Sequence, residues 1–182
     1  MRDITYKELI NTIAKDNFLN AMFSSYIRIS PLSKGRTVLD YGTGYGWGSY
    51  LLCLNAKSVD GFDIDVKKIA FAKEIFKKKN LRFFSDPSLL LKDNNYDLIC
   101  IFQVLQYVQF PYITVSFLIN NIKEGGIIKI SIKNSHKNIQ IILDNIITQN
   151  NIFVLLNKEI YPLSKEDNII EYTFTKISGR DE

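Results

Sequence analysis

The sequence predicts an α/β protein: a three-layer α/β/α sandwich whose mostly parallel, seven-stranded sheet ends in an antiparallel hairpin. Short apolar runs alternate with segments of helical periodicity along most of the 182 residues. This alternation is typical of a parallel sheet with helices on both faces. The last two apolar runs follow one another with no helical segment between them, which predicts the terminal hairpin.

The expected elements run in a regular order. Residues 1–30 carry apolar side chains at helical spacing and predict one or two amphipathic helices, after which Pro31 and Gly35 interrupt the chain. Strands are expected at 37–41, 58–63, 81–84, 96–102, 126–132, 152–160 and 169–177. Helices are expected at 46–55, 66–79, 111–123 and 136–149, with a short one at 87–91. We expect a single domain over 1–182, with a helical cap at 1–34 and a core at 36–182.

Composition places the chain among globular proteins with one core, because 46% of its residues are apolar and one domain takes roughly 100–200 residues. Cys53 and Cys100 lie in apolar runs without metal or redox spacing. The first residues lack the layout of a signal peptide, so we expect a reducing, cytoplasmic location. No apolar run reaches the roughly 20 residues of a bilayer-spanning helix.

The net charge of the chain gives little information about its binding partners. The formal net charge is +4, which is too small to favour nucleic acid as a partner. The lysines between 67 and 79 predict a solvated helix face instead.

A glycine-rich stretch, VLDYGTGYGWG at 38–48, joins the first strand to the next helix. Glycine lacks a Cβ, so such a loop can turn sharply and let a ligand approach its backbone. Asp40 ends the strand at the edge of an open α/β sheet where ligands bind. The next strand ends in Asp63, nineteen residues after Gly44, and a carboxylate at this position can accept hydrogen bonds from a ribose diol.

Two ligand classes contain such a ribose: S-adenosylmethionine (SAM) and a dinucleotide. A dinucleotide fingerprint has the pattern GxGxxG, but here Trp47 or Ser49 occupies the third glycine position. The match to a pyrophosphate cradle is therefore poor. An NAD-dependent oxidoreductase stays as the less favoured alternative.

The stretch VLDYGTGYGWG resembles the first motif of class I SAM-dependent methyltransferases, an acid followed by alternating glycines. The resemblance continues in order over 37–134, through VDGFDIDVKKIAFAKE, LRFFSDPSLL, YDLICIFQVLQYV and IKEGGIIKISIKN, which are similar to the second to fifth strands of that family with their flanking segments. It implies a Rossmann-like fold, SAM as the cofactor and methyl transfer as the activity.

The resemblance also implies a set of cofactor-binding residues. They are Asp40, Gly42, Gly44, Gly46, Asp63, Ile64, Asp86, Pro87 and Phe102. Asp40 and the glycines would hold the methionine end, while Asp63 would take the ribose hydroxyls. Ile64 would pack against adenine, and Asp86 would accept from its amino group beside Pro87 and Ser88. Phe102 and Gln103 would lie beside the sulfonium, and Trp47 would cover the glycine loop.

The aspartates near the predicted site can also have purely structural roles. Asp63 and Asp65 both precede the helix at 66, and either could be its N-cap. We favour Asp65 as the cap and Asp63 as the ligand, because Asp63 directly ends the apolar run. Asp86 precedes a proline and could equally be a turn or cap residue.

The catalytic candidates are Tyr107, Gln103 and His136, and no metal site is expected. Methyl transfer from a sulfonium is a direct displacement, so a base is needed only when the acceptor must lose a proton. Many members of the resembled family have a histidine where this chain has Tyr107. His136 is the only histidine and titrates in a range suited to base chemistry, but beside the potential N-cap Ser135 it can also be a surface residue.

The segment IFQVLQ after the fourth strand lacks the Asn-Pro-Pro-Tyr type of motif found in amino-methylating members of the family. Methylation of DNA bases or of protein glutamine amides is therefore disfavoured, and oxygen of a small molecule or sugar is the leading acceptor. Without a long insertion after the fifth strand, we expect the amino-terminal helices, a second copy or a partner subunit to close the site. An open site would also admit a carrier-bound or macromolecular acceptor. A catalytically silent SAM-fold subunit, acting as a partner or allosteric module, is the second alternative.

Overall fold

A computed structural model describes residues 15–91, 96–149, 153–164 and 167–177. Its helices are α2 (Asn17–Ile29), α3 (Trp47–Cys53), α4 (Val66–Ile75), α5 (Pro111–Asn120) and α6 (Lys137–Gln149), with short 3-10 helices η1 (Ser30–Ser33), η2 (Pro87–Leu91) and η3 (Leu105–Tyr107). Its strands are β1 (Thr37–Tyr41), β2 (Ser58–Phe62), β3 (Leu81–Phe84), β4 (Tyr96–Phe102), β5 (Ile122–Lys133), β6 (Phe153–Pro162) and β7 (Asn168–Lys176). Within these ranges, no helix has the length and apolar character needed to cross a membrane.

The seven strands form one sheet in the order β3-β2-β1-β4-β5-β7-β6. Strands β1 to β5 pair in parallel, whereas β7 runs antiparallel to both β5 and β6. The predicted fold class and terminal hairpin are confirmed. Strand order reverses between β1 and β4, and the carboxyl ends of strands at such a switch point are where ligands bind in open α/β sheets.

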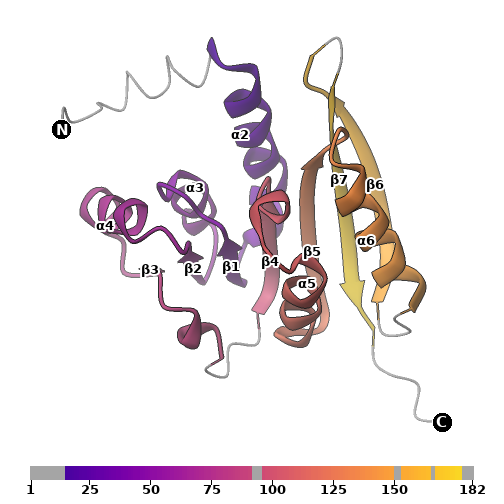
Figure 1. The fold of residues 1–182 in the computed structure, drawn as a ribbon. Coiled ribbons are helices and arrows are strands. Elements are labelled where there is room, and N and C mark those ends of the chain that lie inside the picture. Colours follow the sequence, from indigo (N-terminus) through magenta and orange to yellow (C-terminus); the bar gives the residue numbers. More distant parts are fainter. Residues whose placement is uncertain (1–14, 92–95, 150–152, 165–166, 178–182) are drawn as a thin grey trace.

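Helices cover both faces of the sheet (Figure 1). Successive strand residues point to opposite faces, and β1 shows which helices each face meets. Val38 belongs to a buried cluster that includes residues of α2 and α3, whereas its neighbour Leu39 belongs to a larger cluster that includes residues of α5 and α6. Helix α2, which precedes β1 in the chain, therefore covers the face of the sheet to which Val38 points.

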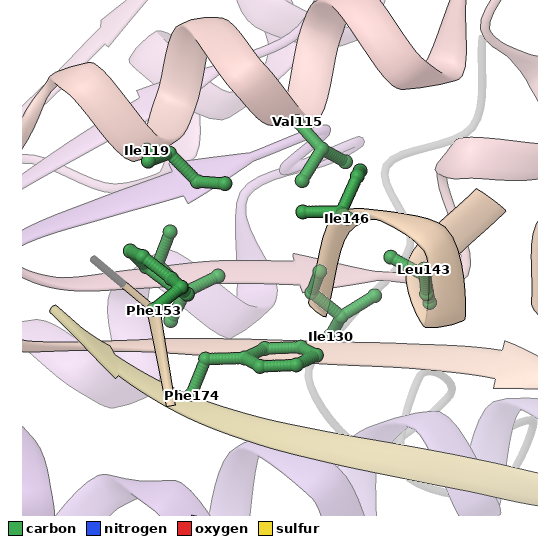
Figure 2. Close-up of a pocket in the computed structure, with 8 residues that line it drawn as sticks. Val115, Ile119, Ile130, Leu143, Ile146, Phe153 and Phe174 are labelled. Carbon is green, nitrogen blue, oxygen red and sulfur yellow. The ribbon is translucent and has the colours of Figure 1, made fainter. Parts of the chain in front are cut away.

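A small apolar pocket lies on the opposite face, between the sheet and helices α5 and α6 (Figure 2). It is lined by Val115, Ile119, Ile128, Ile130, Leu143, Ile146, Phe153 and Phe174. Ligand sites combine apolar walls with a few convergent polar groups. Because this lining offers only apolar side chains, the pocket is a feature of core packing.

Two predicted boundaries were wrong. Helix α4 was expected to reach residue 79 but ends at Ile75, because Phe76 adopts an extended backbone (φ −108°, ψ 95°). Its ring is buried and stacks on Tyr50 with centroids 4.8 Å apart. Strand β5 was expected from residue 126 but begins at Ile122, which already pairs with Tyr96 before an irregularity in the ladder.

The other predicted boundaries agree with the structure to within three residues. The expected N-terminal helices correspond to α2, and the part of that prediction that falls on residues 1–14 lies outside the described residues.

Replacement of Ile130, which is 0% exposed in the core under α5 and α6, should measure how tightly this face is packed. We expect Ile130→Ala to lower the free energy of unfolding by about 2–5 kcal/mol, because it removes buried methyl groups and enlarges a cavity. Urea denaturation followed by circular dichroism measures the loss. The matched control is Ile113→Ala on α5, where Ile113 is 63% exposed and the change should stay within about 0.5 kcal/mol. Equal losses for both variants would contradict the assigned core.

Candidate functional site

The glycine loop, residues 42–46, follows β1 at the carboxyl edge of the sheet. Gly42, Gly44 and Gly46 have φ angles of 81°, 59° and 86°, a region that favours glycine. A Cβ at Gly42 would lie 2.2 Å from a methyl carbon of Val104, whereas a Cβ at Gly44 would meet nothing within 4 Å. The loop is therefore packed against the segment after β4 at its first glycine and open at its second.

Asp63 lies directly beside the open part of this loop. Its Oδ2 accepts a hydrogen bond from the Gly44 N–H at 2.8 Å, and its Oδ1 accepts from the Asp65 N–H at 2.9 Å. A carboxylate has about four acceptor positions, so these two bonds leave capacity for hydroxyl donors. Ile64, the next residue, is 79% exposed and provides apolar surface beside the acid.

Asp65 has the structural role that we favoured for it. Its side chain accepts from the backbone N–H groups of Lys67 and Lys68 and thereby caps α4. The two neighbouring acids thus have different roles. Asp65 caps helix α4, and Asp63 hydrogen-bonds to the glycine loop.

Asp40 is placed differently from the role that the resemblance implies. It is 0% exposed. Its Oδ1 accepts from the Tyr26 hydroxyl at 2.9 Å and its Oδ2 from the Ser49 hydroxyl at 2.7 Å. Burial raises the pKa of Asp40, and the hydrogen bonds from Ser49 and Tyr26 offset part of that rise. The carboxylate is engaged inside the protein, so a direct contact with the methionine end is not what this geometry favours.

Tyr26, on α2, is a residue that sequence reasoning missed. Its buried ring packs edge-on against Phe102, with centroids 4.8 Å apart. A Cβ at Gly48 would lie 2.1 Å from the Tyr26 ring, so the last glycine of the motif makes room for this side chain. That glycine was the available signal, since it falls inside α3, where a glycine needs a packing reason. Phe102 is 2% exposed and its side chain contributes to this packing.

The turn after β4 is the second unusual backbone at this edge. Among the described residues, Gln103 is the one non-glycine with a positive φ, 58°. Its N–H donates to the Ser131 carbonyl at 2.9 Å, and its Nε2 donates to the Ser131 hydroxyl at 3.2 Å. Its own carbonyl accepts from Gln106 Nε2 at 2.9 Å. Val104 then contacts Gly42, which brings this turn against the glycine loop.

Other predicted residues lie in the segments that follow β3, β4 and β5. Tyr107, on η3, is 81% exposed. His136 is half-buried just before α6, and the adjacent Ser135 hydroxyl donates to Asp167. Asp86 accepts from the Ser88 N–H at 2.9 Å at the start of η2, as a turn residue does.

Pro87 is exposed as the first residue of η2. The indole ring of Trp47 packs edge-on against Phe76, with ring centroids 4.7 Å apart. Within the described ranges, no group of three or more His, Cys, Asp or Glu side chains is arranged to hold a metal ion.

A buried ionic cluster fixes α2 to the other half of the sheet. Glu171 on β7 is 0% exposed and accepts hydrogen bonds from Ser25 and Arg28 of α2. It also pairs with Lys129 Nζ on β5 at 3.1 Å, and Lys129 pairs in turn with Glu159 on β6 at 2.9 Å. The signal in the sequence is one charged residue of this cluster within each of the strands β5, β6 and β7.

Known proteins resemble this chain in sequence and in fold. A family model described as a methyltransferase domain matches residues 32–168. A protein of Mycolicibacterium smegmatis named "probable S-adenosylmethionine-dependent methyltransferase" is 28% identical over 109 residues, which are 60% of this chain and 42% of that protein. The match therefore spans less than half of that relative.

Solved structures share the fold as well. The N-methyltransferase NodS of Bradyrhizobium japonicum, in complex with S-adenosylhomocysteine (SAH), has a TM-score of 0.76 and 14% identity, covering 97% of this chain and 94% of that one. The [4+2]-cyclase SpnF has a TM-score of 0.71 and 14% identity, covering 88% and 82%. At these identities the likeness shows the fold alone.

The bond from Tyr26 to buried Asp40 can be tested by Tyr26→Phe, which removes the hydroxyl and keeps the ring. We expect a loss of about 1–3 kcal/mol in unfolding free energy at pH 7, because a buried carboxylate loses a donor. The pKa of Asp40 in the folded state lies above its ordinary value of 3.8. Its ionised form therefore weakens the fold as pH rises through that folded pKa, and the penalty disappears below the unfolded pKa. The loss should accordingly shrink as pH is lowered toward 4.

Urea denaturation at a series of pH values measures this dependence. Tyr45→Phe is the control, because Tyr45 is 53% exposed on the glycine loop. A Tyr26→Phe loss that is absent, or that does not change with pH, would show that the hydroxyl does not support the carboxylate.

Proposed function

Because the chain belongs to the methyltransferase domain family of SAM-dependent enzymes, we propose that it binds SAM at the edge formed by the glycine loop and Asp63 and transfers its methyl group to a small-molecule or sugar acceptor. The observation that carries the proposal is the open backbone at Gly44 beside a carboxylate with unused acceptor capacity. Both lie at the carboxyl ends of adjacent parallel strands.

The donors of the loop favour SAM over a dinucleotide. A pyrophosphate cradle needs several free backbone N–H groups at the start of a helix. Here the N–H groups of Gly42 and Thr43 both donate to the Phe62 carbonyl, that of Gly44 donates to Asp63, and that of Gly46 donates to the Thr43 carbonyl. These four loop donors are used inside the protein and are not free to bind a pyrophosphate.

The residues present fit an adenosyl group. Asp63 would accept hydrogen bonds from the ribose hydroxyls, and the exposed side chain of Ile64 would pack against the adenine ring. The left-handed glycines would admit the methionine end, with Asp40 supporting the loop from behind through Ser49. We also propose that Asp86 and Pro87 line the adenine end of the cofactor and that Phe102 lies beside its sulfonium.

When bound, the cofactor supplies an electrophilic methyl group on a sulfonium, which is displaced directly. The protein must then align the acceptor with that methyl group and exclude water. Gln103 lies at the edge where this alignment would occur, packed between β4 and β5. Tyr107 and His136 stay as candidates at the rim of the acceptor side.

In this proposal, helix α2, a second copy or a partner subunit closes the site. Helix α2 is fixed over the sheet at two places, by Tyr26 on Asp40 and by Arg28 on Glu171. This anchoring supports a helical cap that stays in place over the acceptor side.

The cofactor assignment is tested by isothermal titration calorimetry with SAH. We expect micromolar binding to the full chain, and NAD should not bind. Asp63→Asn should weaken SAH binding by about ten- to hundredfold, because hydrogen bonds to a charged group contribute roughly 1.5–3 kcal/mol. Asp65→Asn is the matched control, since asparagine also caps helices, and it should leave the affinity within about twofold.

Two results would count against the proposal. Equal effects of the two substitutions would show that Asp63 has no special contact with the ribose. Normal SAH binding with no methyl transfer to any acceptor would favour the catalytically silent subunit instead.

A further inference from the structure

We propose that the turn after β4 selects a nitrogen acceptor. In this proposal the side-chain carbonyl oxygens of Gln103 and Gln106 accept hydrogen bonds from N–H groups of a neutral amine that attacks the methyl group. The inference rests on the proposed methyl transfer, and it replaces the oxygen acceptor that the sequence favoured.

The first observation is a pair of buried acceptors without donors. Within the described part of the chain, Oε1 of Gln103 and Oε1 of Gln106 are buried and have no hydrogen-bond partner. Gln103 as a whole is 5% exposed. An unsatisfied buried polar atom destabilises the folded state, so such atoms call for an explanation, and a donor on a ligand would remove that penalty.

The orientation of Gln106 follows from chemistry. Its side chain meets the main-chain carbonyl of Gln103 at 2.9 Å, and a carbonyl oxygen can only accept a hydrogen bond. The atom facing it must therefore be Nε2, which leaves Oε1 on the other side. In Gln103, Nε2 lies 3.2 Å from the Ser131 hydroxyl, a group that can accept or donate. The nitrogen of Gln106 is thus fixed inside the protein, and the oxygens of both amides are buried without a donor.

The backbone supports the same assignment. A glutamine with a φ of 58° occupies a sparsely populated region. Such residues persist where the surrounding structure over-determines them, and they cluster at functional sites. Here three hydrogen bonds hold the residue, two with Ser131 and one with Gln106. Its neighbour Val104 contacts Gly42, so the two glutamines lie next to the loop at which the methyl donor is proposed to bind.

The chemistry of these groups distinguishes nitrogen from oxygen. A hydroxyl must lose its proton to become an effective nucleophile, and a neutral amide carbonyl takes no proton at neutral pH. The carboxylate opposite Ser131 in the sheet register is Glu171, and it is engaged by Ser25, Arg28 and Lys129. The residues bonded to the two glutamines, Ser131 and the Gln103 backbone, are neutral as well.

A neutral amine needs no base for the attack itself. Its N–H groups donate to the two carbonyl oxygens, which points its lone pair away from them. That lone pair forms the new N–C bond while the electron pair of the S–C bond stays on sulfur. The methylated nitrogen is then cationic and releases its extra proton to water.

The experiment uses the full chain with SAM labelled with ¹³C in its methyl group. The acceptors are pairs of primary amines and alcohols with the same carbon skeleton, amino sugars with their parent sugars, and a small-molecule extract of the producing cells. NMR distinguishes N-methyl from O-methyl products. We expect N-methyl products, and Gln106→Met should slow their formation by about ten- to hundredfold for the loss of one hydrogen bond at about 1–3 kcal/mol.

Two controls separate recognition of the acceptor from other roles. Gln109→Met changes an exposed glutamine of the same segment and should leave the rate unchanged. SAH affinity, measured by calorimetry, should stay within about twofold in Gln106→Met, and the amine should bind the SAH complex of that variant about ten- to hundredfold more weakly.

The outcomes are distinguishable. O-methyl products, or N-methyl products whose rate survives Gln106→Met, would overturn the nitrogen assignment while leaving the proposed function intact. A parallel loss of SAH affinity would show that the glutamines serve the cofactor and would overturn it as well. SAH binding without transfer to any acceptor would contradict the proposed function and this inference together.

Discussion

The buried carboxylate of Asp40 is the constraint on which the architecture around the glycine loop depends. Burying a carboxylate is unfavourable unless hydrogen-bond donors surround it. Here the donors come from two helices, Tyr26 on α2 and Ser49 on α3. Ser49 is also 2.7 Å from the Thr43 hydroxyl, which extends the network into the loop itself. A charge at the end of β1 thus holds the helix before the strand, the helix after it and the loop between them.

This constraint separates the roles of the two strand-end acids. Because Asp40 is engaged within the protein, we propose the ligand-facing role for Asp63, which is partly exposed and already oriented by the Gly44 N–H. Helix α2 is anchored a second time by Glu171, through Ser25 and Arg28. Helix α2 shares a buried cluster with residues of β1 and β4. The turn that holds Gln103 and Gln106 packs against the glycine loop through Val104.

The fold was predictable from the sequence because strand and helix periodicity record local burial. The runs that became β1, β3 and β4 were predicted with their observed boundaries, since each is a short apolar segment ended by polar or glycine residues. The end of α4 was not, because Phe76 leaves the helix to stack on Tyr50, a tertiary contact that helical periodicity does not contain. Asp65 as the helix cap was predictable, since capping depends on neighbouring residues.

The candidate site was predictable in its location and less so in its internal contacts. The glycines and Asp63 follow from local pattern. The pairing of Asp40 with Tyr26 depends on how α2 docks, and the left-handed backbone of Gln103 has no local signal, because a glutamine after an apolar run is typical of any turn. The placement of the Gln103 amide depends on Ser131 of β5, a tertiary contact that the local sequence does not contain.

A crystal structure of the full chain with SAH would test the central claim most directly, namely that Asp40 supports the site from inside while Asp63 faces the ligand. The account predicts ribose hydroxyls within hydrogen-bond distance of the Asp63 carboxylate, with Asp40 still bonded to Tyr26 and Ser49. An SAH ammonium group on Asp40 with Tyr26 displaced, or a ribose distant from Asp63, would contradict it.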